Sequence, residues 1–244
     1  MPGGSGRKGA CARMRFHHAP AIWEAHPTLV AGVISASGIT ANVDVQELIE
    51  PFRDSTLARL EQKPVSEFPE VRAWRQAFSA MGLKPTQYRC ASEALLRRLH
   101  KDDSLPQIHP LVDLCNHLSA STAIPIAVFD TGRIDGDLTV RPADGAERYE
   151  TFSGEVEHPA AGEVVFADDV GRAHARRWTN RQSATSAIRD TTREVLIVVE
   201  AFHDGADHDV PALLATLAAH LGDLWGGAPR SAMLTTQWPW FPAD

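Results

Sequence analysis

The sequence predicts an α+β protein in which mixed β-sheets have helices on their flanks and an N-terminal helical region packs against them. Two observations favour this fold class. Apolar residues recur at helical spacing through much of the first half of the chain, whereas residues 124–202 contain short segments rich in Val, Ile, Phe and Thr that Gly, Asp and Pro separate. A chain of 244 residues with 43% hydrophobic and 23% charged residues can bury a sizeable core, as one domain or as two small lobes.

Composition divides the chain into four parts. Residues 1–22 are Gly-rich, basic and without periodicity, so we expect a flexible leader there. The other three parts are a strand with N-terminal helices, a module that contains the sheets, and an extended aromatic tail, and they comprise residues 23–84, 85–225 and 226–244.

A strand is predicted at residues 29–36, and three helices follow it. Each helix has apolar residues at helical spacing, and the three cover about residues 42–52, 66–81 and 90–101. Asn42 or Asp44 can cap the first helix, and Pro51 is expected to kink or split it.

The second half of the chain predicts five strands, at residues 124–129, 137–141, 147–152, 163–167 and 194–202. Residues 195–199, VLIVV, are apolar at every position, which indicates a central strand buried on both faces. Residues 210–221 predict an amphipathic helix that packs on the sheet.

The segment from Leu105 to Asp130 is the part around which we expect the others to be arranged. It contains an apolar run too dense for a surface loop, followed by small residues and a strand that ends at Asp130. Asp113 and Asn116 lie within the run three positions apart, so they share one face of a helix. A buried unpaired polar group costs about 1 to 3 kcal/mol, so both need partners, either in a functional site or in a neighbouring turn.

Composition also disfavours several classes of protein. No apolar run approaches the ~18 residues of a membrane span, and the N-terminus lacks the apolar core of a secretory signal. We therefore expect a cytoplasmic protein without a membrane partner. The three widely spaced cysteines predict neither a disulfide framework nor a zinc site, and the histidines at positions 17, 18 and 26 lack ligand spacing, so no metal and no cofactor is expected.

The charge distribution favours a ligand that touches one side of the protein. A net charge of −7 disfavours a protein that coats DNA or RNA over its whole surface. Residues 172–193 nevertheless contain six Arg against one acid, and residues 84–101 contain five Lys or Arg against one. These segments are either solvated faces balanced by acids elsewhere or contacts for a polynucleotide backbone. The candidate contacts are Arg89, Arg97, Arg176 and Arg177.

The segment VDLCNHLSASTAIPIAVFD, residues 112–130, resembles a pattern in which VDxxN precedes a strand xPxxxFD. That pattern belongs to the editing module of the phenylalanyl-tRNA synthetase beta subunit, also called its tRNA-binding B-three/B-four domain. The resemblance continues through residues 130–149, 162–178 and 194–202 and covers roughly residues 85–203. Free-standing relatives of the module have a cluster that Trp178, Asn180, Arg181 and Gln182 resemble.

The resemblance implies a pocket that accepts the aminoacyl end of a tRNA and hydrolyses the ester of a wrong amino acid. Because that ester is already activated, the enzyme must orient a water molecule and stabilise the developing oxyanion, and it needs no strong nucleophile. The catalytic candidates are Asn116, Gln182 and His109, although His109 has the alternative role of satisfying a loop carbonyl. The candidate substrate-binding residues are Asp113, Asp130, Trp178, Arg181 and Glu200, of which Trp178 and Arg181 can instead form a structural stack.

One position departs from the family pattern. The synthetase module has a His three residues before the strand-ending Asp, and the corresponding residue here is Ala127. A residue that the family uses near the scissile ester is therefore missing. The family's acidic pocket residue has no counterpart that we can place, because residues 178–188 also depart from the synthetase pattern. The hypothesis is that His109, Glu200, Arg181 and Gln182 substitute for these two residues.

Three functions are consistent with these features. The first is a trans-acting editing deacylase for mischarged aminoacyl-tRNA that does not itself charge tRNA, and retention of Asp113 and Asn116 is compatible with it. The second is a non-catalytic module that binds tRNA or an amino-acid-like ligand, which the missing His favours. The third is a hydrolase of small aminoacyl esters, which the acidic net charge favours. The sequence specifies neither the amino acid or tRNA recognised nor the oligomeric state.

Overall fold

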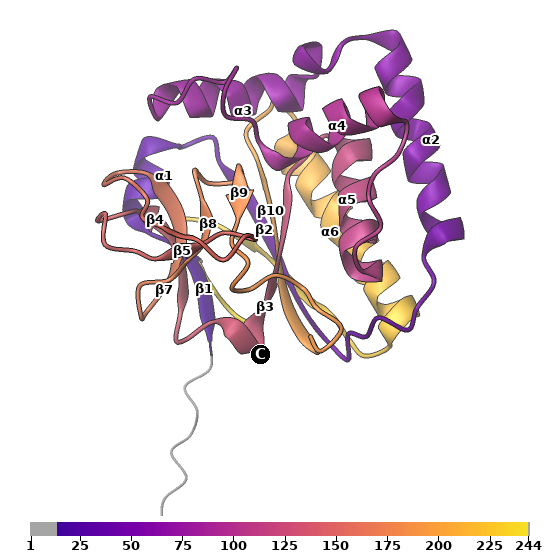
Figure 1. The fold of residues 1–244 in the computed structure, drawn as a ribbon. Helices are drawn as coiled ribbons and strands as arrows, with labels where there is room; N and C mark the ends of the chain where they lie inside the picture. Colours follow the sequence, from indigo (N-terminus) through magenta and orange to yellow (C-terminus); the bar gives the residue numbers. More distant parts are fainter. Residues whose placement is uncertain (1–13, 244) are drawn as a thin grey trace, which may run out of the picture.

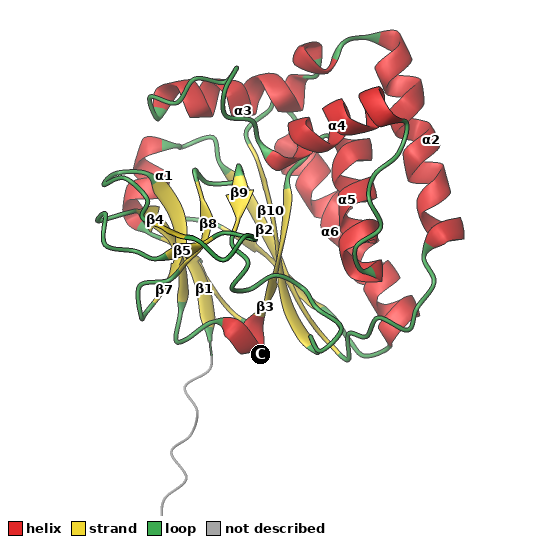
Figure 2. Cartoon of the chain, in the orientation of Figure 1, coloured by secondary structure: helices red, strands yellow, loops and turns green. Residues whose placement is uncertain are grey.

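Three layers follow one another across the molecule in the computed structural model, which describes residues 14–243. A six-stranded sheet packs on one face of a four-stranded sheet, and helices cover the other face (Figure 1). Figure 2 shows the same division, with most strands on one side of the molecule and most helices on the other. The predicted α+β class with mixed sheets and flanking helices is therefore confirmed.

The four-stranded sheet is antiparallel, and its strands in spatial order are β11 (Arg230–Leu234), β2 (Val30–Ser37), β10 (Glu194–Ala201) and β3 (Ile126–Asp130). The order in the six-stranded sheet is β12 (Trp240–Pro242), β1 (Arg15–His18), β4 (Leu138–Pro142), β7 (Val164–Asp168), β8 (Ala173–Arg176) and β9 (Arg181–Gln182). Strands β1 and β4 are parallel, so this sheet is mixed. A hairpin of β5 (Tyr149–Glu150) and β6 (Val156–Glu157) lies beside β8.

The helices are packed in two groups. On the four-stranded sheet lie α5 (Pro110–Thr122) and α6 (Ala206–Trp225), and α2 (Gln46–Gln62) packs on α5. The helices α3 (Pro69–Ala80) and α4 (Ala91–Asp102) lie across the top of the view in Figure 1. A short helix, α1 (Pro20–Ala25), connects β1 to β2, and two 3-10 turns, η1 and η2, occupy Val65–Glu67 and Thr131–Arg133.

Strand β10 separates the two main cores. Leu196 and Val198 belong to the core between the sheets, whereas Val195, Ile197 and Val199 belong to the core beneath the helices. Successive side chains of a strand point to opposite faces, so an unbroken apolar run supplies both cores. The prediction of a central strand buried on both faces is confirmed.

Some elements differ from the sequence-based expectations. Residues 15–18 were assigned to a leader but form β1, because Phe16 is fully buried between β12 and β4 in a strand too short to show a period. Helix α2 continues through Pro51 without a break, and the Asp44 carboxylate accepts a hydrogen bond from the Gln46 N–H (2.9 Å). The tail includes two edge strands, β11 and β12. Residues 1–13, including Cys11, lie outside the described residues.

Two absences apply to residues 14–243. None of the helices there combines the length and the apolar character that crossing a bilayer requires. Nor do three or more His, Cys, Asp or Glu side chains of this range form a group able to hold a metal ion. Cys90 and Cys115 are buried free thiols, and burial raises their pKa to about 11 and about 12.

Helices α3 and α4 are joined by a buried carboxylate. The side chain of Glu93 is fully buried and accepts hydrogen bonds from Arg75 (2.6 and 3.0 Å) and from Arg97 (2.8 Å). Burial by itself would raise the pKa of Glu93, but the hydrogen bonds from Arg75 and Arg97 outweigh it and hold this pKa below its ordinary value.

Replacing this carboxylate should destabilise the fold in a pH-dependent way. We expect Glu93→Gln to lower the free energy of unfolding by about 1.5 to 3 kcal/mol at neutral pH, because charge-assisted hydrogen bonds are lost. Since the folded-state pKa is lowered, the contribution of Glu93 is present above its ordinary pKa of about 4.3 and is lost as the pH falls through the folded-state value. Urea unfolding across a pH series measures both effects.

The exposed Glu61 at the end of α2 provides the matched control. Glu61→Gln should change the free energy of unfolding by less than about 0.5 kcal/mol. A deficit of Glu93→Gln that stays constant into strong acid would contradict the assignment of this ion pair.

Candidate functional site

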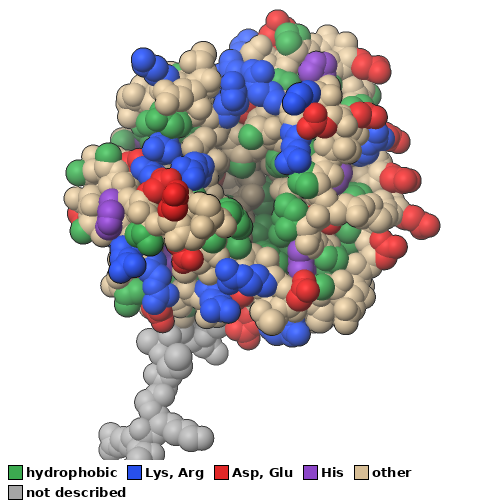
Figure 3. Space-filling view, in the orientation of Figure 1, with side chains coloured by type: hydrophobic (Ala, Val, Ile, Leu, Met, Phe, Trp, Pro, Cys, Tyr) green, Lys and Arg blue, Asp and Glu red, His purple; other side chains and the backbone are tan. Residues whose placement is uncertain are grey.

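A pocket lies between the edges of the two sheets, where β3 of one sheet faces β8 and β9 of the other. About 380 Å³ of space free of protein atoms lies in and at this pocket, part of it open solvent. Its lining comes from β3, β8, β9, the turn between the last two and the first residue of α4, and consists of Ala91, Pro125, Ile126, Ala127, Phe129, Ala175 and residues 178–182. Figure 3 shows the molecule hollowed between its two halves, with hydrophobic side chains inside the hollow and Lys and Arg side chains at its edge.

The turn from Arg177 to Asn180 forms one wall of the pocket and has a strained backbone. Arg177 and Trp178 both adopt positive φ angles, +46° and +57°. Such angles in non-glycine residues cost about 1 to 3 kcal/mol each and persist only where surrounding contacts impose them. The Trp178 N–H donates to the Val164 carbonyl (2.8 Å), and the Asn180 side chain donates to the Arg89 carbonyl (2.8 Å).

The indole of Trp178 is fully buried and has a hydrogen bond at its far end. Its Nε1 donates to Glu200 Oε2 (3.0 Å), and its ring makes edge contacts with Trp74 and Phe202, with centroids 5.4 Å apart in each pair. The ring of His26 approaches to 4.9 Å. These contacts hold the Trp178 ring in one position in the pocket wall.

Gln182 connects the two sheet edges beside the pocket. Its side-chain amide donates to the backbone carbonyl of Val128 in β3 (2.6 Å), and its backbone carbonyl accepts a hydrogen bond from the Tyr149 hydroxyl (2.8 Å). A glutamine amide also has an oxygen that can accept a hydrogen bond. Gln182 therefore combines a structural contact with a side-chain oxygen that has no partner within residues 14–243.

Thr179 was not predicted from the sequence, although it lies within the cluster from Trp178 to Gln182. The residue lines the pocket, and its Oγ1 atom is buried and has no hydrogen-bond partner within residues 14–243. A buried hydroxyl without a partner is unfavourable, so such a group is available to a ligand or a water molecule. Its position between two predicted residues was the signal that could have identified it.

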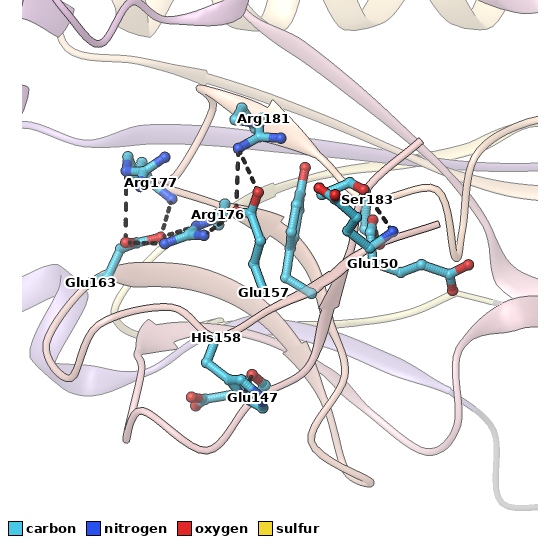
Figure 4. A network of polar contacts seen from close by, with 12 residues as sticks. Glu147, Glu150, Glu157, His158, Glu163, Arg176, Arg177, Arg181 and Ser183 are labelled. Carbon is cyan, nitrogen blue, oxygen red and sulfur yellow. Dashed lines mark hydrogen bonds and ion pairs between the residues drawn. The ribbon is translucent and has the colours of Figure 1, made fainter. Parts of the chain in front are cut away.

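The arginines beside the pocket form an ion-pair network with two glutamates. Figure 4 shows Arg176 and Arg177 directed toward Glu163, and Arg181 directed toward Glu157. The Arg176 side chain is 7% exposed, and its two hydrogen bonds to Glu163 (2.8 and 2.9 Å) raise its pKa above the ordinary value. The Arg181 side chain is 42% exposed, so it is the member of this network that reaches solvent at the pocket.

Of the predicted site residues, Trp178, Arg181 and Gln182 line this pocket, as does Ala127. Glu200 lies behind Trp178, with one carboxylate oxygen accepting from Trp178 and the other from His18 (2.6 Å). Arg89 lies two residues before the start of α4, and Arg97 lies within this helix. The side chain of each is 41% exposed. Arg177 is 17% exposed and its guanidinium lies 4.5 Å from the Tyr88 ring.

The remaining predicted residues have other surroundings. His109 caps α5 by accepting from the Leu111 N–H (3.1 Å), and burial lowers its pKa. Asp113 lines a different cavity between α2 and α5, and the half-buried Asn116 does not line the sheet-edge pocket. Asp130 accepts hydrogen bonds from Thr192 (2.7 Å) and from the N–H of residue 132 (3.0 Å). The residues of the 112–130 motif are thus divided between two places.

A hydrogen-bonded series of Ser186, His174 and Asp168 resembles a hydrolase triad in composition. His174 lies 2.9 Å from Ser186 Oγ and 3.2 Å from Asp168 Oδ2. Ser186 and His174 are fully buried, and neither lines the pocket. Because a nucleophile must reach its substrate, this series has a structural role.

The fold and the site define a module whose pocket lies at the meeting edges of two sheets. The family model of the B3/4 domain matches residues 73–208, and the chain therefore belongs to the B3/4 domain family. The resemblance predicted over residues 85–203 is confirmed.

Similar proteins include phenylalanine–tRNA ligase beta subunits. That of Nitrobacter winogradskyi is 30% identical over 128 residues, which make up 49% of this chain and 15% of that subunit. That of Rickettsia felis is 27% identical over 141 residues, or 57% of this chain and 16% of that subunit. The chain thus spans only a small part of the length of these relatives. This chain also matches a crystal structure of an N-terminal fragment of the phenylalanyl-tRNA synthetase beta subunit from Pyrococcus horikoshii. The match extends over 90% of this chain and 54% of that fragment, with a TM-score of 0.48 and 10% sequence identity.

The unpartnered hydroxyl of Thr179 leads to a prediction about stability. Thr179→Val keeps the shape of the side chain and removes only the hydroxyl, so we expect the free energy of unfolding to stay constant or to rise by up to about 1 kcal/mol. Urea unfolding of the wild type and the variant measures this difference.

Thr192 is the matched control because its buried hydroxyl has two partners, the Asp130 carboxylate (2.7 Å) and the Arg189 N–H (3.0 Å). Thr192→Val should lower the free energy of unfolding by about 1 to 3 kcal/mol. Equal losses in the two variants would show that the Thr179 hydroxyl is already paired in solution.

Proposed function

We propose that the protein is a trans-acting editing deacylase that hydrolyses the ester of mischarged aminoacyl-tRNA, with the aminoacyl group in the pocket between the sheet edges. The observation on which the proposal depends most is the composition of that pocket. Apolar side chains form most of its lining, which also contains two amides, one exposed guanidinium and Thr179, whose hydroxyl has no hydrogen-bond partner in the described part of the chain. An apolar interior suits an amino-acid side chain, and the polar groups suit an ester and its water.

The lining residues supply no general base of the usual kind. Arg181 is the ionisable member among them, and Ala127 occupies the position of the family His. Hydrolysis in this pocket would therefore rely on neutral groups that orient a water molecule, namely the Thr179 hydroxyl and the Gln182 amide oxygen. An aminoacyl ester is activated enough for orientation and oxyanion stabilisation to provide the rate enhancement.

The first turn of α4 can stabilise the oxyanion. Ala91 begins this helix and lines the pocket. The first N–H groups of a helix have no partner within it, and the helix dipole adds positive potential at this end. The developing negative charge would therefore lie near α4, and Arg181, which also lines the pocket, would compensate it.

Contacts with the tRNA backbone would come from arginines near the pocket. Arg89 and Arg97 are partly exposed, and the Arg89 carbonyl binds the pocket residue Asn180. Arg177 contributes less surface, and Arg176 is occupied by glutamates. A one-sided contact of this kind is compatible with the net charge of −7. Cytoplasmic tRNA is the partner that this proposal requires.

A second candidate is a non-catalytic module that binds tRNA or an amino-acid-like ligand in the same pocket. The absence of an imidazole or carboxylate from the lining residues favours it. A third, a hydrolase of small aminoacyl esters, would use the same pocket without the arginines.

Deacylation of a panel of correctly and incorrectly charged tRNAs tests the proposal. We expect selective release of one mischarged species, with the rate reduced about 10-fold or more in Thr179→Val and in the Arg181→Ala, Gln182→Ala double variant, because each loses groups that orient the ester or its water.

Asn116→Ala tests whether a residue of the 112–130 motif that lies outside the pocket takes part in hydrolysis. Since Asn116 does not line the pocket, its replacement should leave the rate within about 3-fold of the wild type, given that effects at distant sites are small. Unchanged hydrolysis in the double variant, together with loss in Asn116→Ala, would overturn the proposed site. If no tRNA is deacylated, a salt series of binding to uncharged tRNA distinguishes the second candidate from the third, because phosphate contacts weaken steeply with salt.

A further inference from the structure

A second cavity lies between helices α2 and α5 and is closed on one side by residues 104–107. It holds about 970 Å³ of space free of protein atoms and is open to solvent. Its lining includes none of the residues that line the sheet-edge pocket. The proposed deacylase function therefore makes no use of it.

His117 lines this cavity, and one of its two ring nitrogens has no hydrogen-bond partner within residues 14–243. The residue is 6% exposed, and its Nδ1 lies 2.8 Å from the carbonyl oxygen of Asp113. A carbonyl oxygen only accepts hydrogen bonds, so Nδ1 bears the proton and Nε2 of the neutral ring is an acceptor. No partner for Nε2 lies within residues 14–243, and His117 lines the cavity. A buried ring that is bonded at one nitrogen and open at the other is prepared for a ligand that donates a hydrogen bond.

Asp113 supplies a second acceptor in the lining of the same cavity. Asp113 and His117 stand four positions apart on α5 and so lie on one face of the helix. Asp113 is 5% exposed, and one carboxylate oxygen accepts the N–H of Ile108 (2.8 Å). The other oxygen has no hydrogen-bond partner in the described part of the chain. Two acceptors on one face can share the donors of a single ligand group.

The cavity has an excess of negative charge. Its lining contains Glu50, Asp54 and Asp113 against Arg53, which leaves a formal charge of −2 from three acids and one base. The Arg53 guanidinium donates to the Asp103 carbonyl (3.1 and 3.3 Å) and pairs with the Asp103 carboxylate (2.9 Å), and its Nη1 lies 3.5 Å from Asp54 Oδ1. Arg53 therefore pairs with one of the cavity acids, whereas Glu50 and Asp113 have no ion pair within residues 14–243. The negative potential is therefore available to a cation.

The same lining also includes an apolar part. Ile49, Leu105 and Pro106 contribute to it, and Ile49 belongs to the buried face of α2. A ligand that uses the whole cavity would combine a cationic group with hydrogen-bond donors and a short hydrocarbon part. Metal ions match this poorly, because no three His, Cys, Asp or Glu side chains within residues 14–243 form a coordinating group.

We propose that the cavity between α2 and α5 is a second binding site, and that its ligand is a small alkylammonium ion. The ammonium group donates to His117 Nε2 and to the free oxygen of Asp113, and the acids at the opening compensate its charge. The hydrocarbon part lies against Leu105 and Pro106. An ammonium carries three donors and no acceptor, which matches a wall that offers acceptors.

The test is an NMR titration of the full chain with 1,4-diaminobutane, followed through the ring protons of His117. We expect a saturable shift of the His117 signals, and no saturable shift with the neutral analogue 1,4-butanediol or with the dianion succinate. Asp113→Asn and His117→Phe should each weaken the affinity at least about 10-fold, because the first removes the negative charge of the carboxylate and the second removes the ring nitrogen that accepts the hydrogen bond.

Substitutions of exposed residues provide a second test in case the variants of the buried residues Asp113 and His117 do not fold. Glu50→Gln removes a cavity acid from the surface of α2, and Glu61→Gln removes the same charge about three helical turns away on the same helix. Glu50→Gln should weaken binding about 3-fold or more by loss of a nearby charge, and Glu61→Gln should leave it unchanged. Equal effects of the two variants, or equal shifts with the diamine and the diol, would overturn the proposal.

Discussion

The buried carboxylate of Glu200 is the group on which the arrangement of the layers most depends. It lies on β10 of the four-stranded sheet and accepts hydrogen bonds from His18 of the six-stranded sheet (2.6 Å) and from Trp178 in the pocket wall (3.0 Å). The backbone carbonyl of the same residue accepts from Trp74 of α3 (3.3 Å). One residue thus joins both sheets, a covering helix and the strained turn that forms the pocket. A carboxyl group with unpaired oxygens would destabilise the core, and here both oxygens are hydrogen-bonded.

The sequence predicted the parts of the fold whose signal is local. The apolar run at residues 195–199 identified the central strand, and the recurrence of Val71, Trp74 and Phe78 identified the face of α3 that is buried. It did not predict β1 or the edge strands of the tail, because strands of three to five residues are stabilised by pairing with distant segments. Pairing of β1 with both β4 and β12 is a tertiary property that no local period reports.

The candidate site was predictable only in part for the same reason. The cluster from Trp178 to Gln182 was identified through a resemblance, and it does line the pocket. The 112–130 motif was treated as one functional unit, but its helix and its strand face different places: Asp113 borders the cavity on α2, whereas Ala127 and Phe129 line the sheet-edge pocket. Proximity along the chain does not specify which side of a layer a residue reaches. The unpaired hydroxyl of Thr179 could be recognised only after every neighbouring donor and acceptor had been placed.

The central claim is that the pocket between the sheet edges receives the aminoacyl group. A crystal structure of the protein with a non-hydrolysable 3′-aminoacylamino-3′-deoxyadenosine tests it most directly. We expect the amino-acid side chain to lie against Ala127, Phe129 and Trp178, with the amide that replaces the ester within hydrogen-bond distance of Thr179 Oγ1. Binding of the aminoacyl group in the cavity between α2 and α5, or anywhere outside the sheet-edge pocket, would contradict it.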